Sequence, residues 1–304
     1  MKKEIEIKQI SEYIRSVLCL KTKDSNDPDP SLDHEELIFR GLSSGSYPLR
    51  PSIDRHPSTH WYNSLLYAER DLISGAQQKI SGFFDNTTLP VAKLSKLQHF
   101  GIPTRMMDVT SNPLVALYFA CRETSSKKSN DGEVAVFSKR AFPALNPYVN
   151  VIADTYRLIG NVNTSIDTFY YKAMKQDYCI SLQYPDWEKD IANRVESFRQ
   201  QVSQLYLVES YELSTRQKNQ QGKYILFPNK VVRDGRKEWL VSDDLMSIDK
   251  NDKSIIKRYI IPADRKKGIM DDLNKLGINE EHLFADNIEI VFNSVREKQV
   301  SRFE

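Results

Sequence analysis

Two hydrophobic patterns alternate along this chain. Apolar side chains at helical spacing predict helices over residues 5–20, 60–82, 90–100 and 264–276, and a run that is apolar all round predicts a buried helix over 114–121. Short apolar runs between turn residues predict strands over 37–39, 104–110, 133–137, 205–209, 223–228 and 255–262. The stretch 140–205 is predicted to be mostly helical, with no pattern regular enough to place its elements. Helices around short strands indicate the α+β class, with a mixed sheet core flanked by helices.

The pattern also predicts how the chain divides. Residues 21–36 are polar and acidic and contain two prolines, which is typical of a loop. We therefore expect an N-terminal helix and linker at residues 1–30, packed on one main domain at residues 31–304.

Composition narrows the class of protein. Of the 304 residues, 40% are hydrophobic and 28% are charged, so the chain has enough apolar surface for a core. No apolar run reaches the roughly 18–20 residues of a membrane span, and charges interrupt the N-terminus, so neither a membrane nor a secretory signal is expected. The three cysteines lie far apart, which fits reduced thiols in the cytoplasm. His56 and His60 have Pro57 between them, so no metal site is predicted.

The first candidate for chemistry is the tripeptide Phe39-Arg40-Gly41. Arg40 ends an apolar strand, where a half-buried guanidinium needs an anion or a set of carbonyl groups. Gly41 has no side chain, so a ligand or another backbone segment can come close to it. The alternative is that Arg40 pairs with an internal carboxylate.

The second candidate is the polar segment 98–113, which lies between two apolar helices. Its polar and ionisable side chains are Gln98, His99, Thr104, Arg105, Asp108, Thr110, Ser111 and Asn112. The helix that begins near Pro113 directs free N–H groups at whatever precedes it, which is typical of a phosphate site. Two alternatives stay open. Arg105 and Asp108 form a buried pair, or Asp108, Thr110 and Ser111 merely cap the helix.

The third candidate is the polar segment 216–224, which leads directly into an apolar strand. Gln220, Gln221 and Gly222 at the strand entrance suit a turn that faces a ligand. A solvated loop explains the same residues equally well.

Together these segments resemble the FRG domain, a family named after its Phe-Arg-Gly motif. The resemblance rests on Phe39-Arg40-Gly41, on the run from Gln98 to Arg105, and on the run from Asp108 to Pro113 with its apolar helix. The segment from Gln220 to Tyr224 is similar to the family's Gln-x-Gly-aromatic element. The likeness extends over most of residues 36–290. FRG domains occur in bacterial and phage proteins, so we expect such an origin here.

A weaker resemblance is to ADP-ribosyltransferases of the Arg-Ser-Glu type. These have an Arg-Gly at the end of their first core strand, a Ser-Thr-Ser strand end before an apolar helix, and a Glu or Gln loop entering a strand. Residues 39–41, 108–111 and 220–222 follow that order. The resemblance implies an ADP-ribosyltransferase-like fold that consumes NAD by transfer or hydrolysis, in a toxin or an anti-phage effector. Gln221 departs from the pattern because it cannot ionise, so Glu69 or Asp108 would have to replace the catalytic glutamate.

This resemblance also implies roles for single residues. Its catalytic residues would be Arg40, His99, Asp108 and Gln221, with His99 bonding a ribose hydroxyl or acting as a base. Its NAD-binding residues would be Arg40, Gly41, Gln98, Thr104, Arg105, Thr110, Ser111 and Asn112. Cleavage of NAD passes through an oxocarbenium-like species, so the pyrophosphate needs cations and the ribose needs a carboxylate or another acceptor. A macromolecular acceptor or a regulatory protein partner is compatible with this chemistry.

Two functions of other classes compete with this hypothesis. The net charge of +2 gives no overall field that favours nucleic acid, yet residues 229–267 carry 11 lysines and arginines against 7 acids. That excess predicts a weak nucleic-acid-binding or RNA-acting surface, and a solvated face is the simpler explanation. The third hypothesis is a non-catalytic, ligand-sensing interaction module, which would bind its ligand without turnover.

Overall fold

The computed structural model describes residues 4–22, 35–55, 65–79, 89–122, 130–159, 164–183, 190–209, 214–235 and 238–285. Its centre is an eight-stranded mixed sheet. The strands in spatial order are β1 (Glu4–Glu6), β11 (Ile255–Ile261), β4 (Gly132–Lys139), β2 (Glu36–Leu42), β3 (Met106–Thr110), β8 (Gly222–Leu226), β7 (Tyr206–Val208) and β5 (Ala141–Phe142). Only the outermost pairs, β1 with β11 and β5 with β7, are parallel. The predicted α+β fold with a mixed sheet flanked by helices is therefore confirmed.

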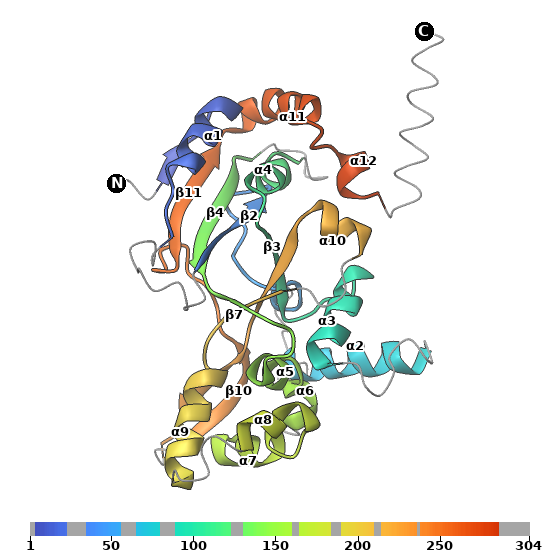
Figure 1. Ribbon diagram of the computed structural model, residues 1–304, viewed down its shortest axis with the longest axis vertical. Coiled ribbons are helices and arrows are strands. Elements are labelled where there is room, and N and C mark those ends of the chain that lie inside the picture. Colours follow the sequence, from blue (N-terminus) through green and yellow to red (C-terminus); the bar gives the residue numbers. More distant parts are fainter. Residues whose placement is uncertain are drawn as a thin grey trace.

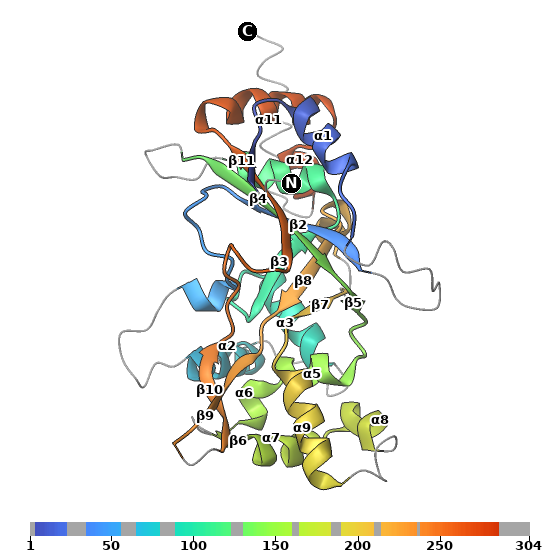
Figure 2. The same cartoon turned by 90° about the vertical axis from the view of Figure 1, so that its left-hand side faces the viewer.

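Helices cover the sheet at two ends. Near β11 and β4 lie α1 (Ile10–Leu18), α4 (Pro113–Cys121), η3 (Ala263–Arg265), α11 (Lys266–Lys275) and α12 (Glu280–Leu283). The other end holds α2 (Leu65–Lys79), α3 (Pro90–His99), α5 (Pro147–Ala153), α6 (Thr155–Leu158), α7 (Ile166–Ala173), η2 (Asp177–Cys179), α8 (Ile180–Gln183) and α9 (Ile191–Val202). A separate antiparallel sheet at that end joins β6 (Thr164–Ser165), β10 (Trp239–Leu245) and β9 (Asn229–Arg233) (Figure 2). Two short helices, η1 (Ser52–Arg55) and α10 (Thr215–Asn219), lie beside the middle strands (Figure 1).

The N-terminal segment differs from the predicted helix over residues 5–20. Its first residues form β1, which pairs with β11, and the Ile7 N–H donates to the Ile260 carbonyl at 2.8 Å. The helix begins only at Ile10, and Tyr13 on it is fully buried. Residues 4–22 therefore share one sheet and one core with the rest of the chain. A three-residue strand cannot be recognised from its own pattern, because it forms only when β11 is present to pair with it.

The helix α4 lies unusually close to the sheet. A Cβ atom added to Gly41 on β2 would lie 2.0 Å from the Ala116 carbonyl oxygen, and one added to Gly132 on β4 would lie 2.2 Å from the Ala120 carbonyl oxygen. Both oxygens belong to the backbone of α4, so only glycine fits at these two strand positions. Gly41 was predicted to let a ligand or another backbone segment come close, and the segment that lies against it is the backbone of this helix.

A buried ionic cluster connects the strands β4 and β11. Glu133 is fully buried, and its carboxylate accepts hydrogen bonds from Lys250 Nζ at 2.7 Å and from Arg258 Nε at 2.8 Å. Burial alone would raise the pKa of Glu133, but the hydrogen bonds and charges of Arg258 and Lys250 outweigh burial and hold this pKa below its ordinary value. The ionised carboxylate is therefore the form that stabilises the fold.

Acid should destabilise the protein through Glu133. Because its pKa is lower in the folded than in the unfolded state, its contribution is complete above the unfolded value of about 4.3 and is lost as the pH falls below it. Glu133→Gln is expected to cost about 1–3 kcal/mol at pH 7 and to flatten the loss of stability below about pH 4. Urea unfolding measured between pH 3 and 7 checks this, with Glu6→Gln on the surface as control. If the free energy of unfolding falls equally steeply with decreasing pH in the unchanged protein, Glu133→Gln and Glu6→Gln, the prediction is wrong.

Candidate functional site

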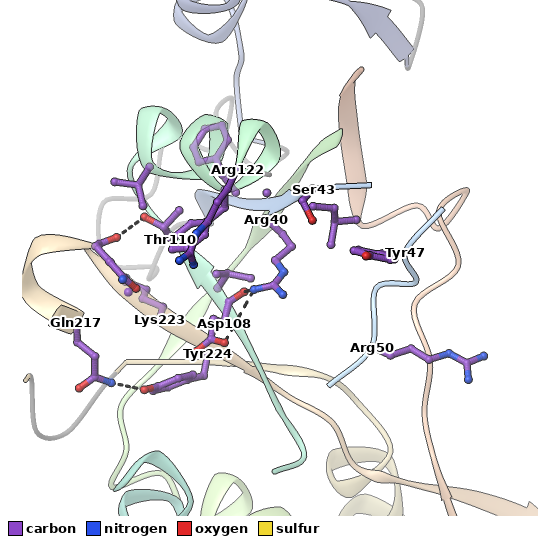
Figure 3. A pocket seen from close by; sticks show the side chains of 18 of the residues that line it. Arg40, Ser43, Tyr47, Arg50, Asp108, Thr110, Arg122, Gln217, Lys223 and Tyr224 are labelled. Carbon is purple, nitrogen blue, oxygen red and sulfur yellow. Dashed lines mark hydrogen bonds and ion pairs between the residues drawn. The ribbon is translucent and has the colours of Figure 1, made fainter. Parts of the chain in front are cut away.

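A pocket of about 660 Å³ lies where β2, β3 and β8 meet the helices α4 and α10 and the loop after β2. Figure 3 shows Arg40 pointing at Asp108 near its centre, with Gln217 and Tyr224 on one side and Tyr47 and Arg50 on the other. Its size is within the range of about 300–1,000 Å³ that is usual for small-molecule sites. The three candidate segments of the sequence therefore meet in neighbouring strands, because β2 pairs with β3 and β3 pairs with β8.

The pocket is strongly cationic. Six of its lining side chains carry positive charge: Arg40, Arg50, Arg55, Arg122, Arg216 and Lys223. Two carry carboxylates: Asp54 and Asp108. The whole chain has a net charge of only +2, so this excess is a local property of the pocket. A pocket of this charge favours an anionic ligand.

Acidic side chains outside or at the rim of the pocket neutralise half of these cations. Lys223 Nζ lies 2.5 Å from Glu36 Oε1, and Arg122 Nη2 lies 2.8 Å from Glu280 Oε1. Arg50 Nη1 lies 3.6 Å from Asp54 Oδ2.

The other three guanidinium groups, those of Arg40, Arg55 and Arg216, are less compensated. Arg216 stacks on the Phe284 ring at 4.8 Å, and Arg55 donates to the Arg50 carbonyl at 3.3 Å. Among the described residues neither has a carboxylate within 4.0 Å. These groups are the ones that an anionic ligand would meet.

Arg40 is placed by β2 with its guanidinium toward the pocket. Its Nη1 donates to the Asp108 carbonyl at 2.8 Å and lies 4.0 Å from the Asp108 carboxylate, while its buried Nε has no hydrogen-bond partner in the described structure. Burial lowers the pKa of Arg40, the charge of Asp108 raises it, and that of Arg55 lowers it further. A buried donor without a partner is costly. The Arg40 side chain is still 18% exposed, so an anion in the pocket would meet the open part of its guanidinium.

Asp108 projects from the middle of β3 into the pocket. Its neighbours in the strand are buried, but its side chain is 63% exposed. One carboxylate oxygen accepts a hydrogen bond from Gln98 Nε2 at 2.8 Å. Tyr224 lies opposite in β8, and burial raises the pKa of its phenol to about 12, so it is neutral near pH 7. Asp108 is thus the charged acceptor at the centre of the pocket.

The start of α4 does not offer the free N–H groups that the sequence predicts there. Asn112 caps this helix, and its side-chain oxygen accepts from Leu114 N at 2.9 Å and from Val115 N at 3.4 Å. Pro113, the first helical residue, has no N–H. The expectation of a phosphate site at this helix end is not met, because the cap already uses these donors.

Thr110 and Ser111 connect the end of β3 to the start of β8. The Thr110 hydroxyl lines the pocket but donates to the Gln220 carbonyl at 2.6 Å. Ser111 N donates to the Gln221 carbonyl at 3.1 Å. Gln221 itself has a positive φ of 46° and is exposed outside the pocket lining, so it shapes this turn. Its neighbour Gln220 lines the pocket instead.

Four other predicted residues lie outside the lining. Gln98 and Thr104 touch the pocket only indirectly, through Asp108. His99 packs edge-on against the Phe100 ring at the end of α3. Arg105 is 1% exposed and binds Glu69 at 2.5 Å, which rules out the predicted buried pair of Arg105 with Asp108. Glu69 is therefore occupied in this ion pair, away from the pocket.

Sequence reasoning missed several lining residues, among them Tyr47, Asp54 and Arg122. They come from the loop after β2, from η1 and from the end of α4, where no local pattern distinguishes them from ordinary surface residues.

In the described part of the basic segment 229–267, four of the basic side chains are paired with a buried carboxylate or are themselves buried. Lys250 and Arg258 pair with buried Glu133, and Lys257 and Lys266 are themselves 3% and 4% exposed. Much of the excess charge that the sequence shows there is used inside the fold, which weakens the prediction of a nucleic-acid-binding face.

Residues 35–129 match the family model of the FRG domain. The chain carries an FRG domain. The match contains β2, α3, β3 and α4, and hence Arg40 and Asp108, whereas the pocket wall from Arg216 to Tyr224 lies beyond it. No curated protein and no solved structure matches the chain.

None of the helices in the described part of the chain has both the length and the apolar character needed to cross a bilayer. The described residues also hold no group of three or more His, Cys, Asp or Glu side chains placed to bind a metal ion.

Proposed function

We propose that the FRG-domain pocket binds NAD and cleaves the bond between its nicotinamide and ribose, as an ADP-ribosyltransferase or an NAD hydrolase. The observation that carries this proposal is the pairing at the pocket centre. Arg40, a guanidinium with an unpartnered buried donor, lies beside Asp108, a carboxylate exposed to the pocket. NAD needs both charges, a cation for its pyrophosphate and an anion for the ribose during cleavage.

The pyrophosphate would lie against the less compensated guanidinium groups. Arg40, Arg55 and Arg216 present flat, fork-shaped donors that match phosphate oxygens. A pyrophosphate brings two negative charges, which offset much of their charge. Tyr47, 43% exposed on the pocket rim, offers an aromatic face for a base or for the nicotinamide ring.

Cleavage of the bond between nicotinamide and ribose needs little more than the charges of these guanidinium groups and of Asp108. The bond between ribose C1′ and the nicotinamide nitrogen breaks, and its electron pair goes to the nicotinamide, which leaves as a neutral molecule. The ribose becomes oxocarbenium-like, and the Asp108 carboxylate stabilises this positive charge. Water or an acceptor group then attacks C1′ and loses a proton to solvent. Water as the nucleophile gives ADP-ribose, and a macromolecular acceptor gives an ADP-ribosylated product.

The order of the strands supports the proposal. The segments that resemble the three motifs of ADP-ribosyltransferases lie on or beside β2, β3 and β8, which are adjacent in the sheet. The third segment has no glutamate in the pocket. We assign the acidic role to Asp108 because its side chain is 63% exposed, whereas that of Asp54, the other lining carboxylate, is 16% exposed and lies 3.6 Å from Arg50. In a cell, such an activity would suit a toxin or an anti-phage effector.

Arg40 is the residue whose removal tests this function. Arg40→Ala is expected to lower the rate of nicotinamide release from NAD by on the order of 100-fold or more, because it removes the cation that holds the pyrophosphate beside Asp108. Mass spectrometry of purified protein with NAD measures the release, with and without added RNA, DNA and protein as acceptors. Arg265→Ala, on η3 and 52% exposed, is the matched control and should behave as the unchanged protein.

The outcomes separate the competing functions. If Arg40→Ala releases nicotinamide from NAD as fast as the unchanged protein does, the proposal is wrong. Binding of NAD without release would favour a ligand-sensing module, and salt-sensitive binding of RNA without either would favour the nucleic-acid hypothesis. Expression in bacterial cells tests the toxin role, which requires cellular NAD and growth to fall with the unchanged protein but not with Arg40→Ala.

A further inference from the structure

A line of hydrogen bonds runs from the backbone of β3 to the Asp108 carboxylate through two side chains that do not line the pocket. The Met106 N–H donates to the Thr104 hydroxyl oxygen at 3.2 Å, and the Thr104 hydroxyl donates to Gln98 Oε1. Gln98 Nε2 then donates to Asp108 Oδ1 at 2.8 Å. Thr104 is 1% exposed, so solvent does not compete for the bonds at its end of the line.

The direction of this line is fixed by its last member. A carboxylate only accepts hydrogen bonds, so the side of the Gln98 amide that faces Asp108 must be its NH₂ group. The amide oxygen then faces Thr104, which must donate to it. Thr104 is free to do so because its oxygen accepts from the backbone of Met106. Each group therefore specifies the orientation of the next.

We infer that Gln98, held by Thr104, is a positioning residue that orients the Asp108 carboxylate for cleavage of NAD, an inference that rests on the proposed function. Gln98 occupies Oδ1, which leaves Oδ2 directed toward the pocket, 4.0 Å from Arg40. A neutral amide orients the carboxylate without cancelling its charge, which a lysine or arginine at the same position would do. The negative charge is thereby kept for the ribose.

This role predicts a specific kinetic signature. Since Gln98 and Thr104 do not line the pocket, their loss should leave KM nearly unchanged and should lower kcat. Misplacement of a catalytic group by about 1 Å can cost on the order of 100-fold in rate. Because the two side chains act as one line, removing both should cost no more than removing one.

The test uses Gln98→Met, Thr104→Val and the double variant, with Thr104→Ser as the conservative variant that keeps the hydroxyl. We expect kcat for nicotinamide release to fall about 100-fold in the first three, with KM within about 2-fold, and Thr104→Ser to stay near the unchanged protein. Thermal melting confirms that each variant is folded. If Thr104→Val unfolds, Gln98→Met and Thr104→Ser still decide the question, because neither removes a buried hydroxyl.

Failure of this inference differs from failure of the proposed function. An unchanged protein that releases no nicotinamide overturns both. If the unchanged protein is active, three results overturn the positioning role alone and leave the proposed function standing. In the first, Gln98→Met keeps its kcat, and in the second it raises KM instead. In the third, the losses of kcat in Gln98→Met and Thr104→Val add fully in the double variant.

Discussion

Replacing Arg105 by methionine is expected to lower the free energy of unfolding by about 3–5 kcal/mol. Arg105 donates from Nε to Glu69 at 2.9 Å and from Nη1 to Asn229 Oδ1 at 2.8 Å, and both charged side chains are almost fully buried. Without the guanidinium, the Glu69 carboxylate is left buried and unpaired, which is far costlier than the loss of an exposed ion pair. Chemical denaturation followed by circular dichroism measures the change.

Two comparisons make the Arg105 prediction specific. Arg265→Met removes an exposed arginine paired with neighbouring Asp264 and should change stability by less than about 0.5 kcal/mol. The double replacement of Arg105 and Glu69 by methionine should be more stable than Arg105→Met alone, because no buried charge remains. A stable Arg105→Met protein with reduced affinity for NAD would instead restore the ligand-binding role that the sequence suggests.

Arg105 also shows where sequence reasoning reaches its limit. Arg40, Asp108 and Thr110 could be found because a polar side chain inside an apolar strand must face something other than the core, and all three line the pocket. Arg105 has the same local pattern. Its partner Glu69 lies on a distant helix, and a pairing between remote elements leaves no trace in the residues around either member.

The fold, like the site, could be predicted only in part from the sequence. The central strands β2, β3, β4 and β11 have strongly apolar sequences, and the pattern predicts each of them within a few residues of its observed bounds. The strands β9 and β10 were missed, because they are half exposed and mixed in polarity. Their strand conformation depends on pairing with each other and with β6, so only the assembled structure defines them.

Gly41 is the second position where a large effect is expected, and for a different reason from the one that its motif suggests. The Cβ of an alanine there would lie 2.0 Å from the Ala116 carbonyl oxygen and 2.9 Å from the Ala120 nitrogen. Both atoms are backbone atoms of α4, so the clash cannot be relieved by turning a side chain, and the helix must move away from β2. We expect Gly41→Ala to cost about 3 kcal/mol or more.

Gly45→Ala provides the control for Gly41→Ala, because the nearest atoms to its added Cβ lie at ordinary distances of 3.6 and 3.7 Å. Its free energy of unfolding should stay within about 0.5 kcal/mol of the unchanged protein. The helix displaced in Gly41→Ala also carries Val115 and Phe119 of the pocket wall, so NAD turnover should fall together with stability. Equal stability of the two variants, with turnover lost only in Gly41→Ala, would mean that this glycine makes room for the ligand. Loss of both would mean that the Phe-Arg-Gly motif joins two tasks at adjacent positions, since Arg40 faces the pocket while Gly41 seats the helix that forms its wall.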